Sequence, residues 1–118
     1  MVQVLLVFTG GGLGSLLRYG IGLIFQKSIS SLPIATLSAN VLACLIFGFT
    51  VYITEQKSEM PPSLKALLLT GFCGGLSTFS TFGFETFTLL KQSEYLWVTV
   101  NVVLSLTLCI GSFALFKH

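Results

Sequence analysis

The chain has 118 residues, of which 53% are hydrophobic and only 8% are charged, whereas soluble domains usually carry about a quarter of charged residues. Six basic and four acidic side chains cannot cover the surface of a soluble globule of this length, so the apolar surface is expected to face lipid. The net charge of +2 comes from scattered residues, which argues against nucleic acid as a partner. Three cysteines without CxxC spacing and a single terminal histidine give no support to a zinc site or a disulfide framework.

Lys, Glu, Gln and Pro interrupt the apolar sequence and leave four segments, at about residues 4–26, 33–54, 63–90 and 95–116. Each segment is long enough for the ~20 helical residues that cross a bilayer. The sequence therefore predicts an all-α integral membrane protein, with residues 1–118 forming a single domain of four transmembrane helices. The connections between the segments are short and leave no room for a catalytic domain outside the membrane.

The lysines give almost no preference for one orientation in the membrane. With four spans they divide three to two between the sides, Lys57, Lys65 and Lys117 against Lys27 and Lys91. Because an excess of basic residues normally marks the cytoplasmic side, two readings stay open. Either the chain inserts in both orientations, or the weak bias is enough for one.

The third segment contains Gly71–Glu85, with the sequence GFCGGLSTFSTFGFE. An unbroken helix over residues 63–90 would be roughly 42 Å long, against a hydrocarbon core of ~30 Å. Paired glycines followed by Ser77 and Thr78 predict a break near its centre. Since broken helices often present backbone groups to ions, residues 74–78 are the first candidate ion site. The alternative is a helix-packing seam formed by the GxxxG pair Gly71 and Gly75.

Phe79 and Phe82 are three residues apart and share a helix face beside the hydroxyls of Ser80 and Thr81. The edges of phenyl rings are positive, and hydroxyl donors can replace water around an anion. The pattern therefore fits the lining of an anion path, but ordinary aromatic packing explains the composition as well.

Asn40 lies near the middle of the second segment, where its amide needs a partner, either in a polar pathway or on a neighbouring helix. The fourth segment aligns Asn101, Ser105, Cys109 and Ser112 on one side. This stripe is read either as a polar track or as side chains that hydrogen-bond back to their own helix.

The first segment carries Arg18 one turn beyond Gly14. Gly10 and Gly14 have the spacing of a close helix contact. An arginine inside a membrane span must snorkel to the interface, pair with another group or lie near an anion path. The glycine cluster lacks the GK[ST] end of a phosphate-binding loop, so nucleotide binding is not expected.

Catalytic groups cannot be assembled from these residues, because paired carboxylates, a nucleophile with a base and a metal cluster are all missing from the sequence pattern. Glu85 is the one acid inside a span. It either relays protons or lies where the third segment reaches the interface. The chain is therefore not expected to be an enzyme.

The combination of GGGLGSLLRY at residues 10–19, Asn40 and GFCGGLSTFSTFGFE at residues 71–85 resembles the Fluc family of fluoride channels, also called CrcB proteins. The resemblance runs through essentially the whole chain. It implies a passive, fluoride-selective export channel of the prokaryotic plasma (inner) membrane. It also implies a dual-topology homodimer, with two antiparallel protomers and two pores.

The same resemblance assigns roles to individual residues. It implies a structural sodium ion at the dimer centre, held by the backbone carbonyls of Gly74 and Ser77 at the break in the third helix. The ion pathway it implies is lined by Asn40, Phe79, Phe82, Ser80, Thr81 and Ser105, with Arg18 in the first span.

Two other functions remain in competition. A small dual-topology four-helix exporter that couples drugs or cations to protons would need a carboxylate deep in its chamber, but the first segment has none and Glu85 lies late in the third. A subunit that only assembles with others would need the glycines but not the run Phe79–Phe82.

Overall fold

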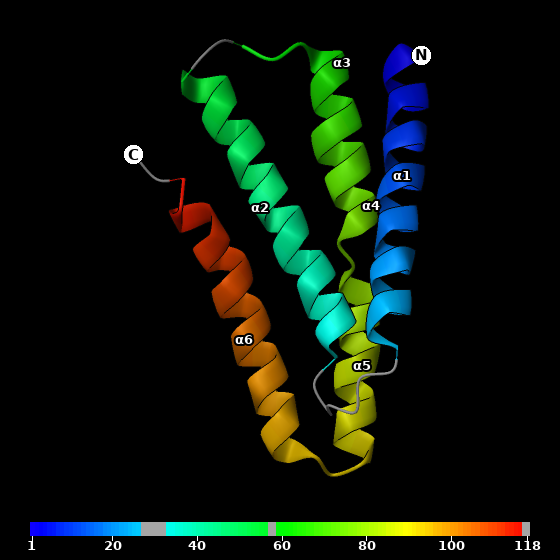
Figure 1. The fold of residues 1–118 in the computed structure, drawn as a ribbon, viewed down its shortest axis with the longest axis vertical. Coiled ribbons are helices and arrows are strands. Elements are labelled where there is room, and N and C mark those ends of the chain that lie inside the picture. Colours follow the sequence, from blue (N-terminus) through cyan, green and yellow to red (C-terminus); the bar gives the residue numbers. More distant parts are fainter. Residues whose placement is uncertain (27–32, 57–58, 117–118) are drawn as a thin grey trace.

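The computed structural model describes residues 1–26, 33–56 and 59–116, and these residues are helical apart from short turns and connections (Figure 1). The elements, in chain order, are α1 (Val2–Phe25), α2 (Ile34–Gln56), α3 (Pro62–Lys65), the π-helical stretch η1 (Ala66–Cys73), α4 (Gly74–Leu76), α5 (Phe79–Lys91) and α6 (Tyr95–Ala114).

Four helical segments are long and apolar enough to cross a membrane, which confirms the prediction of an all-helical chain with four such segments. They cover Val2–Phe25, Ile34–Gln56, Pro62–Lys91 and Tyr95–Ala114, within about two residues of the predicted bounds. The connection at 27–32 and three of the lysines used for the orientation count, Lys27, Lys57 and Lys117, lie outside the described residues.

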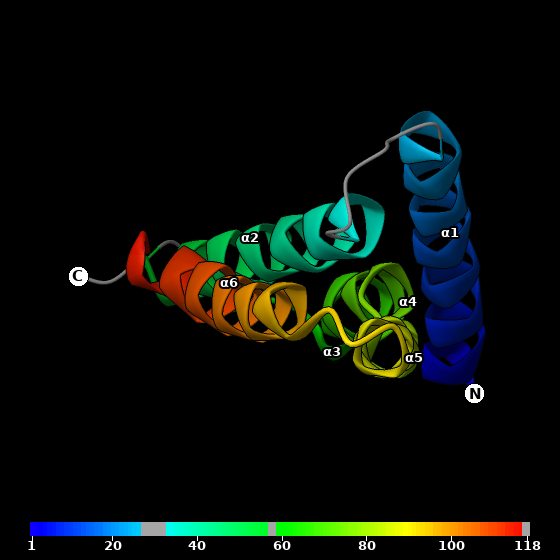
Figure 2. The same ribbon diagram turned by 90° about the horizontal axis from the view of Figure 1, so that it is seen from below.

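The chain alternates in direction along the long axis of the molecule (Figure 1). Seen along that axis, the segment from α3 to α5 lies between α1 and the pair formed by α2 and α6 (Figure 2). Helix α1 packs along η1 and α4, and α2 packs along α6. The third segment thus has helices packed on two of its sides.

Glycines bring α1 against the third segment. A Cβ atom on Gly10 would collide with the carbonyl oxygen of Leu67, and one on Gly14 with the carbonyl oxygen of Phe72. In the opposite direction, a Cβ on Gly75 would collide with the carbonyl oxygen of Gly11. The close contact predicted from Gly10 and Gly14 is therefore present, and small residues allow the two backbones to touch.

The buried core is small and consists largely of small side chains. Ala39, Ala43, Cys73 and Leu76 form it. Many large apolar side chains face outward instead, among them Phe8, which is 80% exposed, and Ile24, which is 76% exposed. Such outer faces suit lipid or another apolar surface rather than water.

One irregularity was not predicted from the sequence. Residues Ala66–Cys73 form a π-helix, in which hydrogen bonds reach back five residues instead of four. The stretch ends where α4 begins, so the third segment changes its winding just before Ser77 and Thr78 leave the helix.

The glycine contact makes a test of the packing possible. Replacing Gly14 with Ala should destabilise the fold by about 1–3 kcal/mol, because the added methyl group overpacks a backbone contact. Replacing Gly12, where an added methyl group would meet no described atom within 4 Å beyond its own stretch of helix, should change stability by less than about 1 kcal/mol. Unfolding of the two variants in detergent measures the difference. Equal stability of Gly14→Ala and Gly12→Ala would show that the close contact is unimportant.

Candidate functional site

Two extended residues interrupt the third segment. Helix α4 ends at Leu76, Ser77 has φ −83° and ψ 157°, and Thr78 has φ −152° and ψ 122° before α5 begins at Phe79. Two residues outside the helical region deprive several neighbouring peptide groups of their usual partners. Other groups must therefore satisfy these peptides, and the structure shows which ones do.

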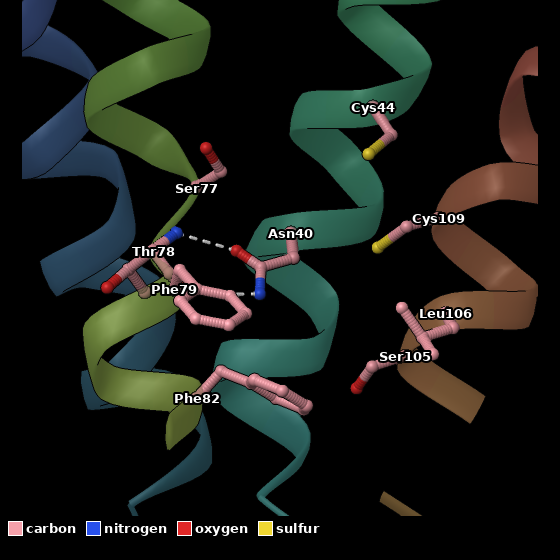
Figure 3. A pocket seen from close by; sticks show the side chains of 9 residues that line it. All are labelled: Asn40, Cys44, Ser77, Thr78, Phe79, Phe82, Ser105, Leu106 and Cys109. Carbon is pink, nitrogen blue, oxygen red and sulfur yellow. Dashed lines mark hydrogen bonds between the residues drawn. The ribbon is translucent and has the colours of Figure 1, made fainter. Parts of the chain in front are cut away.

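Asn40 on α2 pairs with the peptide groups of Thr78 (Figure 3). Its Oδ1 accepts from the Thr78 N–H at 2.7 Å, and its Nδ2 donates to the Thr78 carbonyl oxygen at 3.3 Å. The sequence left Asn40 between a polar pathway and an interhelical hydrogen bond. In the structure it makes the interhelical bond, and its side chain also lines a pocket.

The pairing with Asn40 changes which carbonyl groups keep a helical donor. In a continuous helix the Thr78 N–H would donate to the carbonyl of Gly74, and the Thr81 N–H to that of Ser77. Here the Thr78 N–H donates to Asn40, and the Thr81 N–H donates to the Thr78 hydroxyl at 3.2 Å. The carbonyls of Gly74 and Ser77 are thereby released from their usual partners.

Arg18 on α1 bonds to a third carbonyl at the interruption, that of Gly75. Its Nε donates to the carbonyl oxygen of Gly75 at 3.0 Å. Of the readings offered by the sequence, pairing with another group is the one observed. Arg18 also lines a second pocket of about 450 Å³, to which Thr36, Thr81 and Glu85 contribute.

Thr78 caps the N-terminus of α5. Its hydroxyl accepts from the Thr81 N–H and donates to the Thr81 Oγ1 at 3.1 Å, while the Ser80 Oγ lies 3.4 Å away. A threonine in this position satisfies one of the unpaired N–H groups at a helix start. The hydroxyls of Ser80 and Thr81 thus gather around the end of the extended pair.

The pocket lined by Asn40 has a volume of about 230 Å³ and lies between α2, the start of α5 and α6 (Figure 3). Its lining residues are Asn40, Cys44, Ser77, Thr78, Phe79, Phe82, Ser105, Leu106 and Cys109. Four of the predicted pathway residues, Asn40, Phe79, Phe82 and Ser105, therefore meet here. Thr81 and Arg18 line the second pocket instead, with Thr78 shared by both.

Two features of the pocket bear on an anion. Ser105 is buried, and its hydroxyl has no hydrogen-bond partner in the described part of the chain. The rings of Phe79 and Phe82 lie with centroids 5.7 Å apart and planes tilted by 39°. Phe79 is 83% exposed, so the pocket is open on this side of the chain. A free hydroxyl and two rings suit a small solute that needs donors and positive ring edges.

Glu85 lies against α2. Its Oε2 accepts from the Thr36 hydroxyl at 3.0 Å, and its Oε1 is buried without a hydrogen-bond partner among residues 1–26, 33–56 and 59–116. The sequence singled out Glu85 as the acid within a span but gave no sign of Thr36 as its partner.

The polar side chains aligned on α6 do not all behave alike. Ser112 bonds back to the Leu108 carbonyl at 2.7 Å, and Asn101 donates to the Thr86 hydroxyl at 3.0 Å. Of these aligned residues, only Ser105 and Cys109 reach the pocket. Helix α6 thus contributes Ser105, Leu106 and Cys109 to the pocket, and its polar side chains do not form a continuous track.

Comparison with known proteins decides the family. A family model described as "CrcB-like protein, Camphor Resistance (CrcB)" matches residues 5–116. The chain belongs to the CrcB family. This confirms the resemblance found in the sequence.

Relatives of this CrcB-family chain include the "Fluoride-specific ion channel FluC" of Serratia proteamaculans (strain 568), 40% identical over 104 residues, which are 88% of this chain and 82% of that protein. The protein of the same name from Salmonella arizonae is 41% identical over 116 residues, 98% of this chain and 89% of its own length. Both are named as ion channels, which are not enzymes. With the four apolar helices, this makes the chain a multi-pass membrane protein.

Metal ligands of the usual side-chain type do not gather in this CrcB-family chain. Within the described ranges there is no group of three or more His, Cys, Asp or Glu residues that could hold an ion.

The Asn40 pairing gives the second prediction. Asn40→Ala leaves the Thr78 peptide groups without their partners, and should lower the free energy of unfolding by about 1–3 kcal/mol. Amide hydrogen exchange around residue 78 should also become faster. The matched control is Thr54→Ala on the same helix, because the Thr54 hydroxyl bonds back to the Thr50 carbonyl of its own helix. If both variants exchange alike at residue 78, Asn40 does not hold the extended pair.

Proposed function

We propose that this chain forms a passive, fluoride-selective ion channel in a prokaryotic plasma (inner) membrane. The observation that carries the proposal is family membership at about 40% identity to proteins named fluoride-specific ion channels, over nearly the whole chain. The pocket beside the extended pair supplies a physical basis for it.

Fluoride is small and strongly hydrated, so a path for it must offer donors in place of water without binding the ion too tightly. The Ser105 hydroxyl has no partner in the described residues. The Asn40 amide carries two hydrogens, of which one donates to Thr78 and the other is left for a solute. The positive edges of Phe79 and Phe82 add a weaker attraction.

Ser80, Thr81 and Arg18 extend this polar environment on the other side of Thr78. Thr81 and Arg18 line the second pocket, and the Ser80 hydroxyl contacts that of Thr78. Thr78 lines both pockets. A path that passes the extended residues would therefore meet hydroxyl and guanidinium donors before it reaches Ser105 and the two rings.

The working unit is proposed to be an antiparallel homodimer with two pores. One protomer leaves the pocket open beside Phe79, and large apolar side chains cover its outer faces. The lysines in the sequence divide three to two between the sides, an excess of only one, so both orientations can be inserted. A second copy in the opposite orientation would close the pocket and cover part of the apolar surface.

A structural sodium ion is proposed at the centre of this dimer. The carbonyl oxygens of Gly74 and Ser77 fit it, because their usual helical donors bond to Asn40 and Thr78 instead. Unwound backbone carbonyls are the groups that hold sodium in broken membrane helices. The bound ion would supply a fixed positive charge that offsets the charge of nearby anions.

Efflux from liposomes tests the function. Purified protein should release fluoride far faster than chloride, and the rate should not depend on a proton gradient. The carrier alternative, a proton-coupled drug or cation exporter, predicts proton-dependent flux of an organic cation instead. Folded protein that releases fluoride no faster than protein-free liposomes would contradict the channel proposal.

Within the same assay, Phe82→Ile should slow fluoride release by about tenfold or more, because the aliphatic side chain has no positive ring edge. Leu106→Ile, also in the pocket lining, is the control for a change of shape. The Phe82 variant should still form dimers. Unchanged flux would mean that Phe82 only packs.

Assembly gives a separate prediction. A tag at the C-terminus should be open to protease on about half of the copies in sealed vesicles, because neither orientation is favoured. Replacing sodium by N-methylglucamine at equal ionic strength should lower the thermal midpoint, because an ion bound only by the folded dimer stabilises it by mass action. Protection of the tag on every copy would contradict the antiparallel dimer. A thermal midpoint that does not change with sodium would contradict the sodium site.

A further inference from the structure

Two cysteines meet at the edge of the pocket. Cys44 comes from α2 and Cys109 from α6, and both line it. Figure 3 shows the two side chains turned toward each other, with their sulfur atoms in the space between the two helices. Both side chains are half-buried, whereas the third cysteine, Cys73, is buried.

The pair adjoins the polar groups of the proposed fluoride path. Cys44 lies four residues after Asn40 on α2, and Cys109 lies four residues after Ser105 on α6. Residues four apart share a helix face, so the thiols form the next layer of the same pocket. A group bound between them would stand directly beyond Asn40 and Ser105.

We propose that Cys44 and Cys109 form a two-coordinate site for soft, thiol-binding metal ions such as Hg²⁺, and that an ion bound there closes the pathway. The second part rests on the proposed function. Thiolate ligands select soft ions, whereas hard cations such as Mg²⁺ and Ca²⁺ take oxygen ligands. Zinc normally needs four ligands, and the described residues offer no group of three or more His, Cys, Asp or Glu.

The chemistry balances without a redox step. Each thiol loses its proton to water and forms one S–Hg bond, so one Hg²⁺ replaces two protons and the oxidation states stay unchanged. The pair is neutral before and after the exchange. This matters at membrane depth, because an uncompensated charge there is costly. The bound ion would also tie α2 to α6 beside the pocket.

The test uses the full-length protein in liposomes, with mercury(II) chloride as the probe. Two quantities are measured: the mercury retained per chain after excess is removed, and the fluoride efflux rate before and after metal. We expect one tightly held mercury per chain and at least about a tenfold loss of rate. A small dithiol should remove the metal and restore the rate.

Single substitutions locate the site. Cys44→Ser and Cys109→Ser should each lose the tightly held mercury and the block, with each variant compared with its own metal-free rate. Cys73→Ser is the matched control and should keep both. The proposal is overturned if Cys73→Ser alone abolishes binding, if all variants are blocked alike, or if mercury occupies the pair without slowing efflux.

The two proposals fail in different ways. If the metal-free protein does not conduct fluoride, the proposed function is wrong, and the mercury count in the four proteins still decides whether the thiol pair binds metal. If the metal-free protein conducts but the count does not depend on Cys44 and Cys109, the thiol site is wrong and the channel proposal stands.

Discussion

A peptide group inside a membrane must find a hydrogen-bond partner, because hydrocarbon offers none and each unsatisfied group costs several kcal/mol. A continuous helix would satisfy every such group, but the extended residues Ser77 and Thr78 interrupt the helix. They persist because other helices supply the missing partners: Asn40 from α2 pairs with both peptide groups of Thr78, and Arg18 from α1 donates to the Gly75 carbonyl. The interruption therefore fixes how α1 and α2 sit against the third segment.

Packing and hydrogen bonding depend on each other at this point. Arg18 lies one turn beyond Gly14, whose missing side chain lets α1 touch the backbone of Phe72. Gly75, which accepts from Arg18, also touches Gly11 through its missing side chain. A side chain at either glycine would move α1 outward and lengthen the hydrogen bond. The small residues thus serve the polar contact as well as the helix contact.

Features that depend on local spacing could be predicted from the sequence. The length of the apolar runs gave four spanning helices, and the spacing of Gly10 and Gly14 gave the contact of α1. Features that depend on which helices face each other could not. Nothing local in the sequence places Cys44 and Cys109 at the same pocket or pairs Glu85 with Thr36, because the two residues of each pair lie on separate helices.

The π-helical stretch was not predictable from the sequence either. Its residues, Ala66–Cys73, have an ordinary apolar pattern, and no glycine pair or proline within it marks a change of winding. Its place beside the backbone of α1 was likewise not predictable, because it follows from a contact between distant residues such as Leu67 and Gly10.

Hydroxyl groups distinguish the pocket from the rest of the bundle. Thr50, Thr54 and Ser112 bond back to carbonyls of their own helices, which satisfies a hydroxyl without any neighbour. Ser105 has the same opportunity on α6, yet its buried hydroxyl has no partner in the described residues. A buried donor left unpaired destabilises a fold by about 1–3 kcal/mol. A solute in the pocket that accepted from this hydroxyl would remove that penalty, so Ser105 is the pocket residue whose hydrogen bonding a bound anion or water would improve most.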